Sequence, residues 1–368
     1  MFDDCLIMAG GSGTRLWPAS SSGLPKQFLP ASGKASFFSM AVERALALTG
    51  TNGRVVVIAG KSHIPHVIAD VAGLSAGKKK RLLVIGEPAA KNTAPAVACA
   101  VSRSLLDGGQ RNMLVLTSDH IIKPLDAFKA DAAVAASHAS NGKLVVFGIR
   151  PGRPETGYGY IEIGGGKAAP AHKVTAFHEK PDLQTARKYA ASRRFFWNSG
   201  MFAFSAEFMA ERFRSLAPDV FLPFEKLKAP DPDSCTVLNG VRVLDSWPGL
   251  ENAYRKTKSI SFDYAIAEKC PDTVMVSTGF DWIDIGNWEE YARICDGNRS
   301  QVFGVSGETC YVDSDIPVAL AGVEDLIVVI RSGKDGTPAK ALVTRKGQTQ
   351  KVREVVEQIK KAGRLDLL

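Results

Sequence analysis

Near its start, the chain passes from an apolar run directly into a glycine-rich loop, in the stretch Cys5-Leu6-Ile7-Met8-Ala9-Gly10-Gly11-Ser12-Gly13-Thr14-Arg15-Leu16-Trp17-Pro18. This order of a strand followed by a glycine-rich loop is the main indication of the fold. The run Cys5–Ala9 has no polar side chain and predicts a strand buried on both faces. Glycines let backbone N–H groups approach phosphate oxygens, and Arg15 adds a fixed cation. Position 16 is leucine rather than the third glycine of a dinucleotide motif, and no P-loop lysine follows. The loop favours a phosphate ligand over a purely structural turn, without identifying that ligand.

Similar apolar runs recur along the first half of the chain, separated by stretches of helical period. They predict strands at Cys5–Ala9, Arg54–Ala59, Arg81–Ile85, Asn112–Leu116 and Lys143–Phe147. Helices are expected over Ala94–Asp107, with Thr93 as the N-cap, and over Leu125–Ser140. This alternation predicts an α/β fold with a mostly parallel sheet covered by helices on both faces.

The second half of the chain has a looser pattern. Turns, aromatic residues and prolines from about Gly148 predict an inserted substrate-binding lobe, at about residues 148–285. After about Gly297, a small β domain is expected from the short runs Val302–Val305, Thr309–Val312, Val318–Ala321, Leu326–Val329 and Ala341–Thr344. The predicted domains are therefore residues 1–297 and 298–368.

A closing helix is predicted over Thr349–Ala362. Its apolar residues Val352, Val355, Val356 and Ile359 form one stripe, and Gly363 follows as a C-cap. Such a stripe must be covered, so we expect the helix to dock on the β domain or on a second subunit. Closed two-fold pairing would give a homodimer.

Composition limits the class of protein. The chain has 368 residues, of which 45% are hydrophobic and 23% charged, and its net charge is +8. A basic balance suits nucleic acid or a polyanionic small substrate. Within the sequence the longest Lys/Arg run is Lys78–Arg81, without interleaved aromatic residues, which argues against nucleic-acid binding. Six scattered cysteines, an acidic start and no apolar run of about 18 residues predict a cytoplasmic protein with no membrane segment.

Further motifs follow the glycine-rich loop. In Pro25-Lys26-Gln27, a lysine fixed by proline could give a triphosphate its second positive charge. The others, in order, are Glu87-Pro88, Asn92-Thr93-Ala94-Pro95, Thr117-Ser118-Asp119-His120, Glu155-Thr156-Gly157-Tyr158-Gly159-Tyr160-Ile161, Phe177-His178-Glu179-Lys180-Pro181, Trp197-Asn198-Ser199-Gly200-Met201-Phe202, Ser261-Phe262-Asp263-Tyr264 and Phe280-Asp281-Trp282-Ile283-Asp284-Ile285-Gly286-Asn287-Trp288. Together with the loop they resemble the signature of sugar-phosphate nucleotidylyltransferases, in particular the mannose-1-phosphate guanylyltransferase branch.

The resemblance implies a fold and a reaction. The fold is a Rossmann-like nucleotidyltransferase domain followed by the small β domain, which could be left-handed β-helix-like. The enzyme would transfer GMP from GTP to mannose 1-phosphate, giving GDP-mannose and pyrophosphate. Charge neutralisation and positioning dominate such a transfer, because the sugar phosphate attacks the α-phosphorus in line. The partners would then be these two substrates, with no nucleic acid or membrane.

Residue roles are implied by the same resemblance. The nucleotide would be bound by Ala9, Gly10, Gly11, Ser12, Gly13, Thr14, Arg15, Lys26, Glu87, Asn92, Thr93 and Ser118. The sugar phosphate would be bound by Tyr158, Gly159, Glu179, Lys180 and Asn198. The catalytic set would be Arg15, Lys26, Asp119, Lys180 and Asp284. Asp263 is interpreted instead as supporting a helix start by its charge.

Magnesium is the implied cofactor, held by Asp119 and Asp284. Mg²⁺ prefers carboxylates and phosphate oxygens, and Asp119 comes at the end of an apolar strand, where parallel sheets bind ligands. A turn-capping role is the alternative for Asp284.

Two departures from the family pattern leave alternatives open. Ser21 stands where the family usually has arginine, and Lys91 stands where it has arginine before the N-T-A-P motif. Lysine keeps the charge but loses the bidentate fork. Another hexose 1-phosphate or nucleotide, a metal-dependent glycosyltransferase and a catalytically weak regulatory homologue therefore remain as competing hypotheses.

Overall fold

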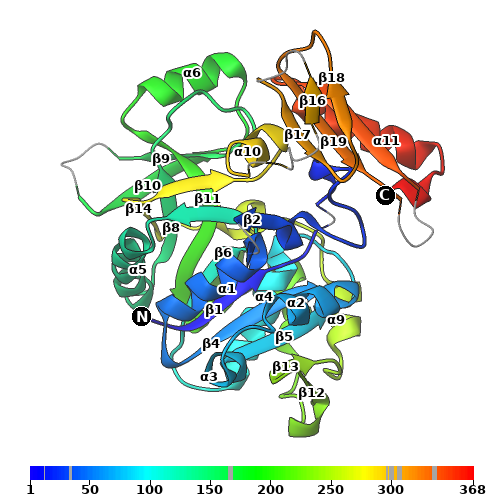
Figure 1. Ribbon diagram of the computed structural model, residues 1–368. Coiled ribbons are helices and arrows are strands. Elements are labelled where there is room, and N and C mark those ends of the chain that lie inside the picture. The colour runs from blue at the N-terminus through cyan, green and yellow to red at the C-terminus, as the bar shows by residue number, and fades with distance from the viewer. Residues whose placement is uncertain are drawn as a thin grey trace. The chain divides into compact units, whose positions relative to one another are not determined.

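Strand β1 (Phe2–Met8) lies inside a large mixed sheet (Figure 1), between the parallel strands β4 (Thr49–Gly60) and β6 (Asn112–Thr117). The computed structural model describes residues 1–368 except 12, 33–34, 165–168, 296, 298–301, 305–308 and 334–337. Contacts between these residues divide the chain into two compact units. Unit 1 is Met1–Gly10, Ala41–Ser118 and Ile122–Trp282; unit 2 is Gly11–Met40, Asp119–Ile121 and Ile283–Leu368.

The large sheet belongs to unit 1. Among the described residues it has eleven strands, in the order β12 (Cys235–Leu238), β13 (Val241–Leu244), β5 (Leu82–Glu87), β4, β1, β6, β11 (Phe195–Ser205), β8 (Leu144–Ile149), β14 (Thr273–Ser277), β10 (Ala171–His178) and β9 (Tyr160–Ile163). The block β13-β5-β4-β1-β6 is parallel throughout. Strand β11 is antiparallel to β6 and β8, and β10 is antiparallel to β14 and β9. Apart from β13, the parallel block therefore comes from the first half of the chain. The lobe adds mostly antiparallel strands, although β14 is parallel to β8.

Helices cover both faces of this sheet. Val146 and Phe147 are neighbours in β8 and point to opposite faces. Val146 lies in a buried cluster with side chains of α4, whereas the ring of Phe147 packs on Phe128 of α5, with ring centroids 5.9 Å apart. The helical segments of unit 1, some continuing into unit 2, are α1 (Phe37–Leu48), η3 (Lys61–His63), α2 (Ile64–Asp70), α3 (Ala76–Lys80), α4 (Thr93–Leu106), α5 (Leu125–Ser140), α6 (Leu183–Ala191), α7 (Ala206–Leu216), α8 (Pro218–Glu225), η4 (Pro232–Ser234), α9 (Leu250–Lys256) and the π-helix η5 (Asp263–Ala267).

The predicted α/β architecture is confirmed, with one local correction. Each predicted strand of the first half overlaps a strand of the parallel block or β8, and α5 has the predicted bounds. Thr93 was wrongly predicted as the N-cap of α4. Asn92 takes that place, with a φ of 71° and its side-chain oxygen accepting the Thr93 N–H at 2.8 Å.

Unit 2 contains the glycine-rich loop and the end of the chain. Its elements, some continuing from unit 1, are η1 (Thr14–Leu16), η2 (Lys26–Phe28), β2 (Pro30–Ser32), β3 (Ala35–Ser36), β7 (His120–Lys123), β15 (Asp281–Asp284), α10 (Trp288–Ala292), β16 (Val302–Gly304), β17 (Tyr311–Ser314), β18 (Val318–Leu320), β19 (Leu326–Arg331), β20 (Lys340–Arg345), η6 (Thr349–Lys351), α11 (Val352–Lys361) and η7 (Leu365–Leu367). Strand β16 pairs in parallel with β18, and β17 with β19, although each pair is close in sequence. Such local parallel pairing is the arrangement of a β-helix.

The predicted closing helix is present, although its first turn is the 3₁₀ segment η6. Val352 and Val356 are buried in a cluster that also contains Leu16 and Trp17 of the glycine-rich segment, whereas Val355 is 37% exposed. The apolar stripe is thus covered in part by the same chain. None of the helices in the described residues combines the length and the apolar character that crossing a membrane requires.

Candidate functional site

Lys26 lies between the two aspartates predicted to hold a metal. Its ammonium Nζ is 2.7 Å from Asp119 Oδ2 and 3.8 Å from Asp284 Oδ1, and it donates to the carbonyl oxygen of Ile285 at 2.8 Å. The three side chains are 14%, 20% and 23% exposed. All three belong to unit 2, although they come from three distant parts of the sequence.

Gly13 explains why the glycine-rich loop and the Pro-Lys motif occur together. Its φ is 57°, and a Cβ there would collide with the backbone nitrogen of Lys26. The hydroxyl of buried Ser20 donates to the carbonyl oxygen of Gly13 at 2.6 Å and holds the loop from the other side. Only glycine fits this close approach at a positive φ.

His120 completes a group that could hold a metal ion. One ligand atom each from Asp119, His120 and Asp284 lies within 4.8 Å of the others, and His120 Nε2 is 3.8 Å from a carboxylate oxygen of each aspartate. Two carboxylates with open coordination positions match the oxygen preference of Mg²⁺, which usually keeps several waters. The residues therefore fit the predicted cofactor.

Electrostatics keep the aspartate and the lysine charged. Burial by itself would raise the pKa of Asp119, but the Lys26 ammonium and then His120 outweigh burial and lower it. Burial likewise opposes the charge of Lys26, yet Asp119 and Asp284 raise its pKa. In this arrangement Lys26 supplies positive charge to two carboxylates that a metal ion would otherwise neutralise.

Arg15 is the exposed cation of the loop. It lies in η1, and its Nη1 would be 3.9 Å from a Cβ built on Gly286, two residues after Asp284. Gly11 has a φ of 102° with no neighbour within 4 Å of such a Cβ, and Thr14 begins η1. Ser12, also predicted to bind nucleotide, lies outside the described residues.

The remaining predicted nucleotide residues belong to unit 1. Glu87, at the end of β5, is 8% exposed, and a Cβ on Gly10 would lie 2.8 Å from its Oε1. Among the described residues its Oε2 accepts no hydrogen bond of normal geometry. Burial raises the pKa of Glu87 to about 7, although the nearby Tyr254 hydroxyl lowers it. Ala9 and Ser118 are both buried.

Asn92 and Thr93 connect two motifs. The φ of Asn92 is 71°, a conformation that residues other than glycine rarely adopt outside functional sites and turns. The Thr93 hydroxyl accepts the N–H of Phe262 at 2.8 Å, and Ala94 N–H donates to Ile260 at 3.1 Å. The start of α4 is thereby joined to the segment that leads into Asp263.

The predicted sugar-side residues of unit 1 also come together. A Cβ on Gly159 would lie 2.6 Å from Glu179 Oε2, so the end of this carboxylate side chain lies directly against the glycine. The N–H of Asn198 donates to the carbonyl oxygen of Gly159 at 2.8 Å. Lys180 forms an ion pair with Glu179, and its φ of 44° again marks a strained backbone. Tyr158 packs edge-on against the rings of Trp197 and Trp282, with centroids 5.4 and 5.3 Å away.

Asp263 belongs to this group, which the sequence interpretation missed. It does lie in the first turn of a helix, the π-helix η5, but its Oδ1 also accepts the side-chain N–H of Asn198 at 2.7 Å. Burial raises the pKa of Asp263; Asn198 lowers it, and the charge of Glu179 raises it further. The sequence signal for this role is the Ser-Phe-Asp-Tyr motif itself.

Two protein-family models match the chain, one after the other along the sequence. The family model described as nucleotidyl transferase matches residues 4–300, and the model described as MannoseP isomerase/GMP-like beta-helix domain matches residues 301–359.

Curated relatives match almost the whole chain. The mannose-1-phosphate guanylyltransferase of Escherichia coli (strain K12) is 38% identical over 98% of this chain and 74% of its own length. The xanthan biosynthesis protein XanB of Xanthomonas campestris pv. campestris (strain B100) is 37% identical over 98% of this chain and 73% of its own. A crystal structure described as mannose-1-phosphate geranyltransferase from Thermus thermophilus is 30% identical, covers 97% of this chain and 99% of that chain, and superimposes with a TM-score of 0.77.

Proposed function

The chain belongs to the nucleotidyl transferase family, and from this premise we propose that it transfers GMP from GTP to mannose 1-phosphate, giving GDP-mannose and pyrophosphate. One observation carries the proposal most directly: Lys26 lies between Asp119 and Asp284 in the segment that also presents Arg15. Two cations and two carboxylates are the groups that a metal-bound triphosphate requires.

The proposed reaction divides the work among these residues. Arg15 and Lys26 bind the triphosphate, and Asp119 and Asp284 would hold Mg²⁺, which when bound neutralises charge on the phosphate oxygens. Lys180 binds the phosphate of the sugar and holds the attacking oxygen for in-line displacement of pyrophosphate. None of these residues has to accept a proton, because the attacking group is already an ionised phosphate.

Mannose 1-phosphate is proposed from the named relatives and from the polar groups of unit 1. Glu179, Asn198 and the backbone of Gly159 offer carboxylate, amide and carbonyl groups within one small region. Sugar hydroxyls need both donors and acceptors, and this set supplies both. Lys180 has a φ of 44°, and its exposed ammonium group forms an ion pair with Glu179.

Guanine as the base is supported by Glu87. Guanine presents two neighbouring N–H donors, and an ionised carboxylate can accept both. Glu87 is buried beside Gly10, and its Oε2 accepts no hydrogen bond of normal geometry among the described residues. A buried acceptor left unpaired also discriminates against a base that lacks those donors.

A substrate panel tests the proposal. Pyrophosphate release and nucleotide-sugar formation are measured with each pair of a nucleoside triphosphate and a hexose 1-phosphate, in the presence of Mg²⁺. The highest kcat/KM is expected for GTP with mannose 1-phosphate, and chelation of the metal should abolish turnover. A different preferred pair would overturn the substrate assignment. If no pair released pyrophosphate, the chain would be a binding or regulatory homologue.

Two further predictions remain proposals. The division into a catalytic domain of residues 1–297 and a β domain of residues 298–368 is tested by whether the first part alone still binds GTP. The homodimer is tested by light scattering of the intact protein at micromolar concentration, where a monomeric mass would refute it. Neither binding to nucleic acid nor association with a membrane forms part of the proposed function.

A further inference from the structure

We infer that the C-terminal segment 352–368 positions the loop that carries Arg15, and that Trp17 transmits this effect. The inference rests on the proposed function for its consequence, namely triphosphate affinity. The buried indole N–H of Trp17 donates to the carbonyl oxygen of Leu367 at 2.7 Å, across 350 positions of sequence. Beside it, the N–H and the hydroxyl of Ser22 both donate to the Leu368 oxygen at 3.2 Å.

Trp17 is also bound to the segment that follows Asp284. The indole N–H of Trp288, a fully buried residue, donates to the carbonyl oxygen of Trp17 at 2.9 Å. Trp17 thus accepts a hydrogen bond from Trp288 through its main-chain carbonyl and donates one to Leu367 through its indole N–H. Arg15 is two residues before Trp17, and Asp284 is four residues before Trp288. The two tryptophans therefore fix the loop cation relative to a proposed metal ligand.

Helix α11, the first part of the segment 352–368, packs against the loop. Val352 and Val356 are 2% and 1% exposed and share one buried cluster with Leu16 and Trp17. In Figure 1 the red end of the chain lies beside the dark-blue segment that contains η1, as the hydrogen bonds of Trp17 and Ser22 require. Val355, one position earlier in the same helix, is 37% exposed and offers a matched surface position.

Arg15 needs such support because its own segment is short. Only three residues, Thr14–Leu16, form the 3₁₀ turn, and one such turn fixes little by itself. Arg15 is exposed, so packing of its own side chain does not hold it either. A loop held in its binding geometry before the ligand arrives loses less conformational entropy on binding. Loosening Trp17 or α11 should therefore weaken binding of the triphosphate specifically.

Two pairs of variants test this inference. Trp17→Phe removes the N–H donor and keeps an aromatic ring, and Val356→Ala loosens α11. Their controls are Val355→Ala and Trp247→Phe, since Trp247 in unit 1 is 4% exposed and donates to Lys228 at 2.8 Å in the same manner. Calorimetry with Mg·GTP should show about three- to tenfold weaker binding for Trp17→Phe and Val356→Ala, the loss expected from one hydrogen bond or a partial cavity. The control variants should match the wild type.

A second measurement separates this inference from the proposed function. Hydrogen exchange of the backbone amides in residues 13–22 should be faster in Trp17→Phe and Val356→Ala than in the wild type, without any ligand. Unchanged exchange and unchanged Mg·GTP affinity in both variants would overturn the positioning role. If the wild type itself neither bound GTP nor released pyrophosphate, the proposed function would fail, whereas faster exchange would still support the link between segment 352–368 and the loop. Equal loss of mannose 1-phosphate and GTP affinity would also contradict the inference, because the loop should act on the triphosphate.

Discussion

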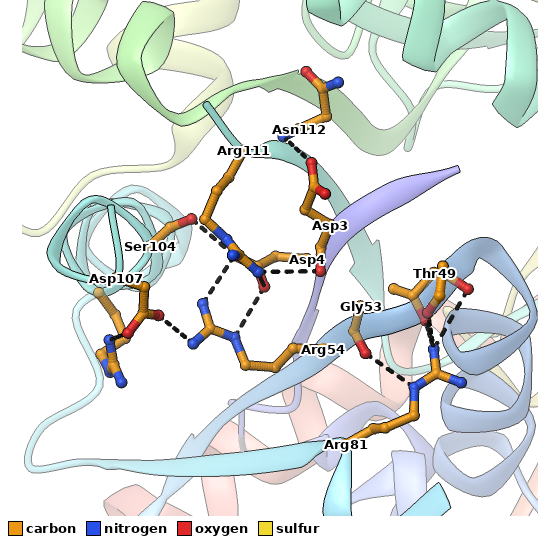
Figure 2. A network of polar contacts seen from close by, with 12 residues as sticks. Asp3, Asp4, Thr49, Gly53, Arg54, Arg81, Ser104, Asp107, Arg111 and Asn112 are labelled. Carbon is orange, nitrogen blue, oxygen red and sulfur yellow. Dashed lines mark hydrogen bonds and ion pairs between the residues drawn. The ribbon is translucent and has the colours of Figure 1, made fainter. Parts of the chain in front are cut away.

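Asp4 lies in β1 and Asp119 follows the neighbouring strand β6, but only the first is saturated with hydrogen bonds. Asp4 is fully buried, and its two oxygens accept side-chain N–H groups of Arg54 and Arg111, all at 2.9 Å (Figure 2). The hydroxyl of Ser104 adds a bond of 2.8 Å to Oδ2. Arg54 in turn pairs with Asp107. The carboxylate of Asp4 is bidentate to two guanidinium groups, which is the strong form of ion pair.

Within the part of the chain that the structure describes, Asp119 and Asp284 have far fewer partners. Lys26 is within hydrogen-bond distance of Asp119 only, since its distance to Asp284 is 3.8 Å. His120 is also 3.8 Å from each of them, which is too long for a hydrogen bond. Both side chains keep about a fifth of their surface exposed. Their oxygens therefore retain positions for another ligand.

The difference separates a structural use of carboxylates from a functional one. A buried charge costs stability unless hydrogen bonds compensate it fully, and Asp4 meets that requirement. A carboxylate that binds a ligand must instead keep oxygens available, so the protein compensates it only in part. On this comparison, changing Asp4 should affect folding, whereas changing Asp119 or Asp284 should affect chemistry.

The largest effect is expected for Asp119→Asn and Asp284→Asn. Each removes a charge from the proposed metal site without changing volume, so turnover should fall by at least about a hundredfold. The urea unfolding midpoint should fall less than in Asp4→Asn, because each carboxylate has fewer partners among the described residues and Lys26 keeps the other aspartate as a counter-charge. Steady-state kinetics at saturating Mg²⁺ are the measurement. Wild-type turnover in either variant would remove that residue from the metal role.

Asp4→Asn should show the opposite pattern. The amide cannot accept from two arginines through both positions, and the guanidinium groups stay partly buried without their counter-charge. The free energy of unfolding should fall by about 3–5 kcal/mol. Activity per folded molecule should stay close to that of the wild type at low temperature. A variant with wild-type stability but low kcat would contradict the structural assignment of this network.

Glu87 lies between these two cases, because it is buried like Asp4 and unsaturated like Asp284. Its pKa in the folded protein is about 7 against an ordinary 4.5, so folding stability is lost as pH rises between those values. Glu87→Gln should therefore be more stable than the wild type at pH 8, by up to about 3 kcal/mol, and equal to it near pH 4. The measurement is urea unfolding at both pH values.

The same variant tests whether Glu87 serves the guanine base. Ionised Glu87 is the form that accepts two N–H groups, so GTP affinity of the wild type should increase from pH 6 to pH 8. The triphosphate's own titration is common to both proteins and cancels in the comparison. Glu87→Gln should lack the additional increase and bind GTP more weakly at pH 8. If its GTP affinity equalled that of the wild type at every pH, Glu87 would have no part in base recognition.

Much of the fold could be predicted because its strands are apolar on both faces. The apolar residues of Cys5–Ala9 and of Leu144–Phe147 have no alternative to burial, and β1 and β8 are indeed buried. The prediction failed where local hydrogen bonding decides. Asn92 rather than Thr93 caps α4, because the Asn92 side-chain oxygen accepts the Thr93 N–H, and asparagine is the more preferred N-cap residue of the two. Similarly, the stripe of α11 indicates a buried face but not that Leu16 and Trp17 cover part of it.

The candidate site was predicted only where motifs exist. The motifs that contain Lys26, Asp119 and Asp284 point to one phosphate site, and these side chains do lie together. The Asp4 network was not predicted, because its arginines are about 50 and 107 positions away and belong to no motif. Long-range ion pairs of this kind depend on strand order, which a single sequence does not give.

The smallest effects are expected for the exposed cations Lys180 and Arg15. Each of them is assigned to a different substrate, so their variants test the two assignments separately. Lys180 has a side chain that is 60% exposed and pairs with Glu179, and Arg15 is also exposed. Solvent screens such charges, so each alanine variant should change a KM by about tenfold rather than abolish turnover. Lys180→Ala should raise the KM for mannose 1-phosphate, and Arg15→Ala the KM for GTP. Lys26→Ala should resemble Arg15→Ala with a larger effect, because Lys26 is more buried and its loss leaves Asp119 without its close cation. Kinetics with each substrate varied in turn decide the matter: if Lys180→Ala raised only the KM for GTP, the sugar-side role of unit 1 would have to be abandoned.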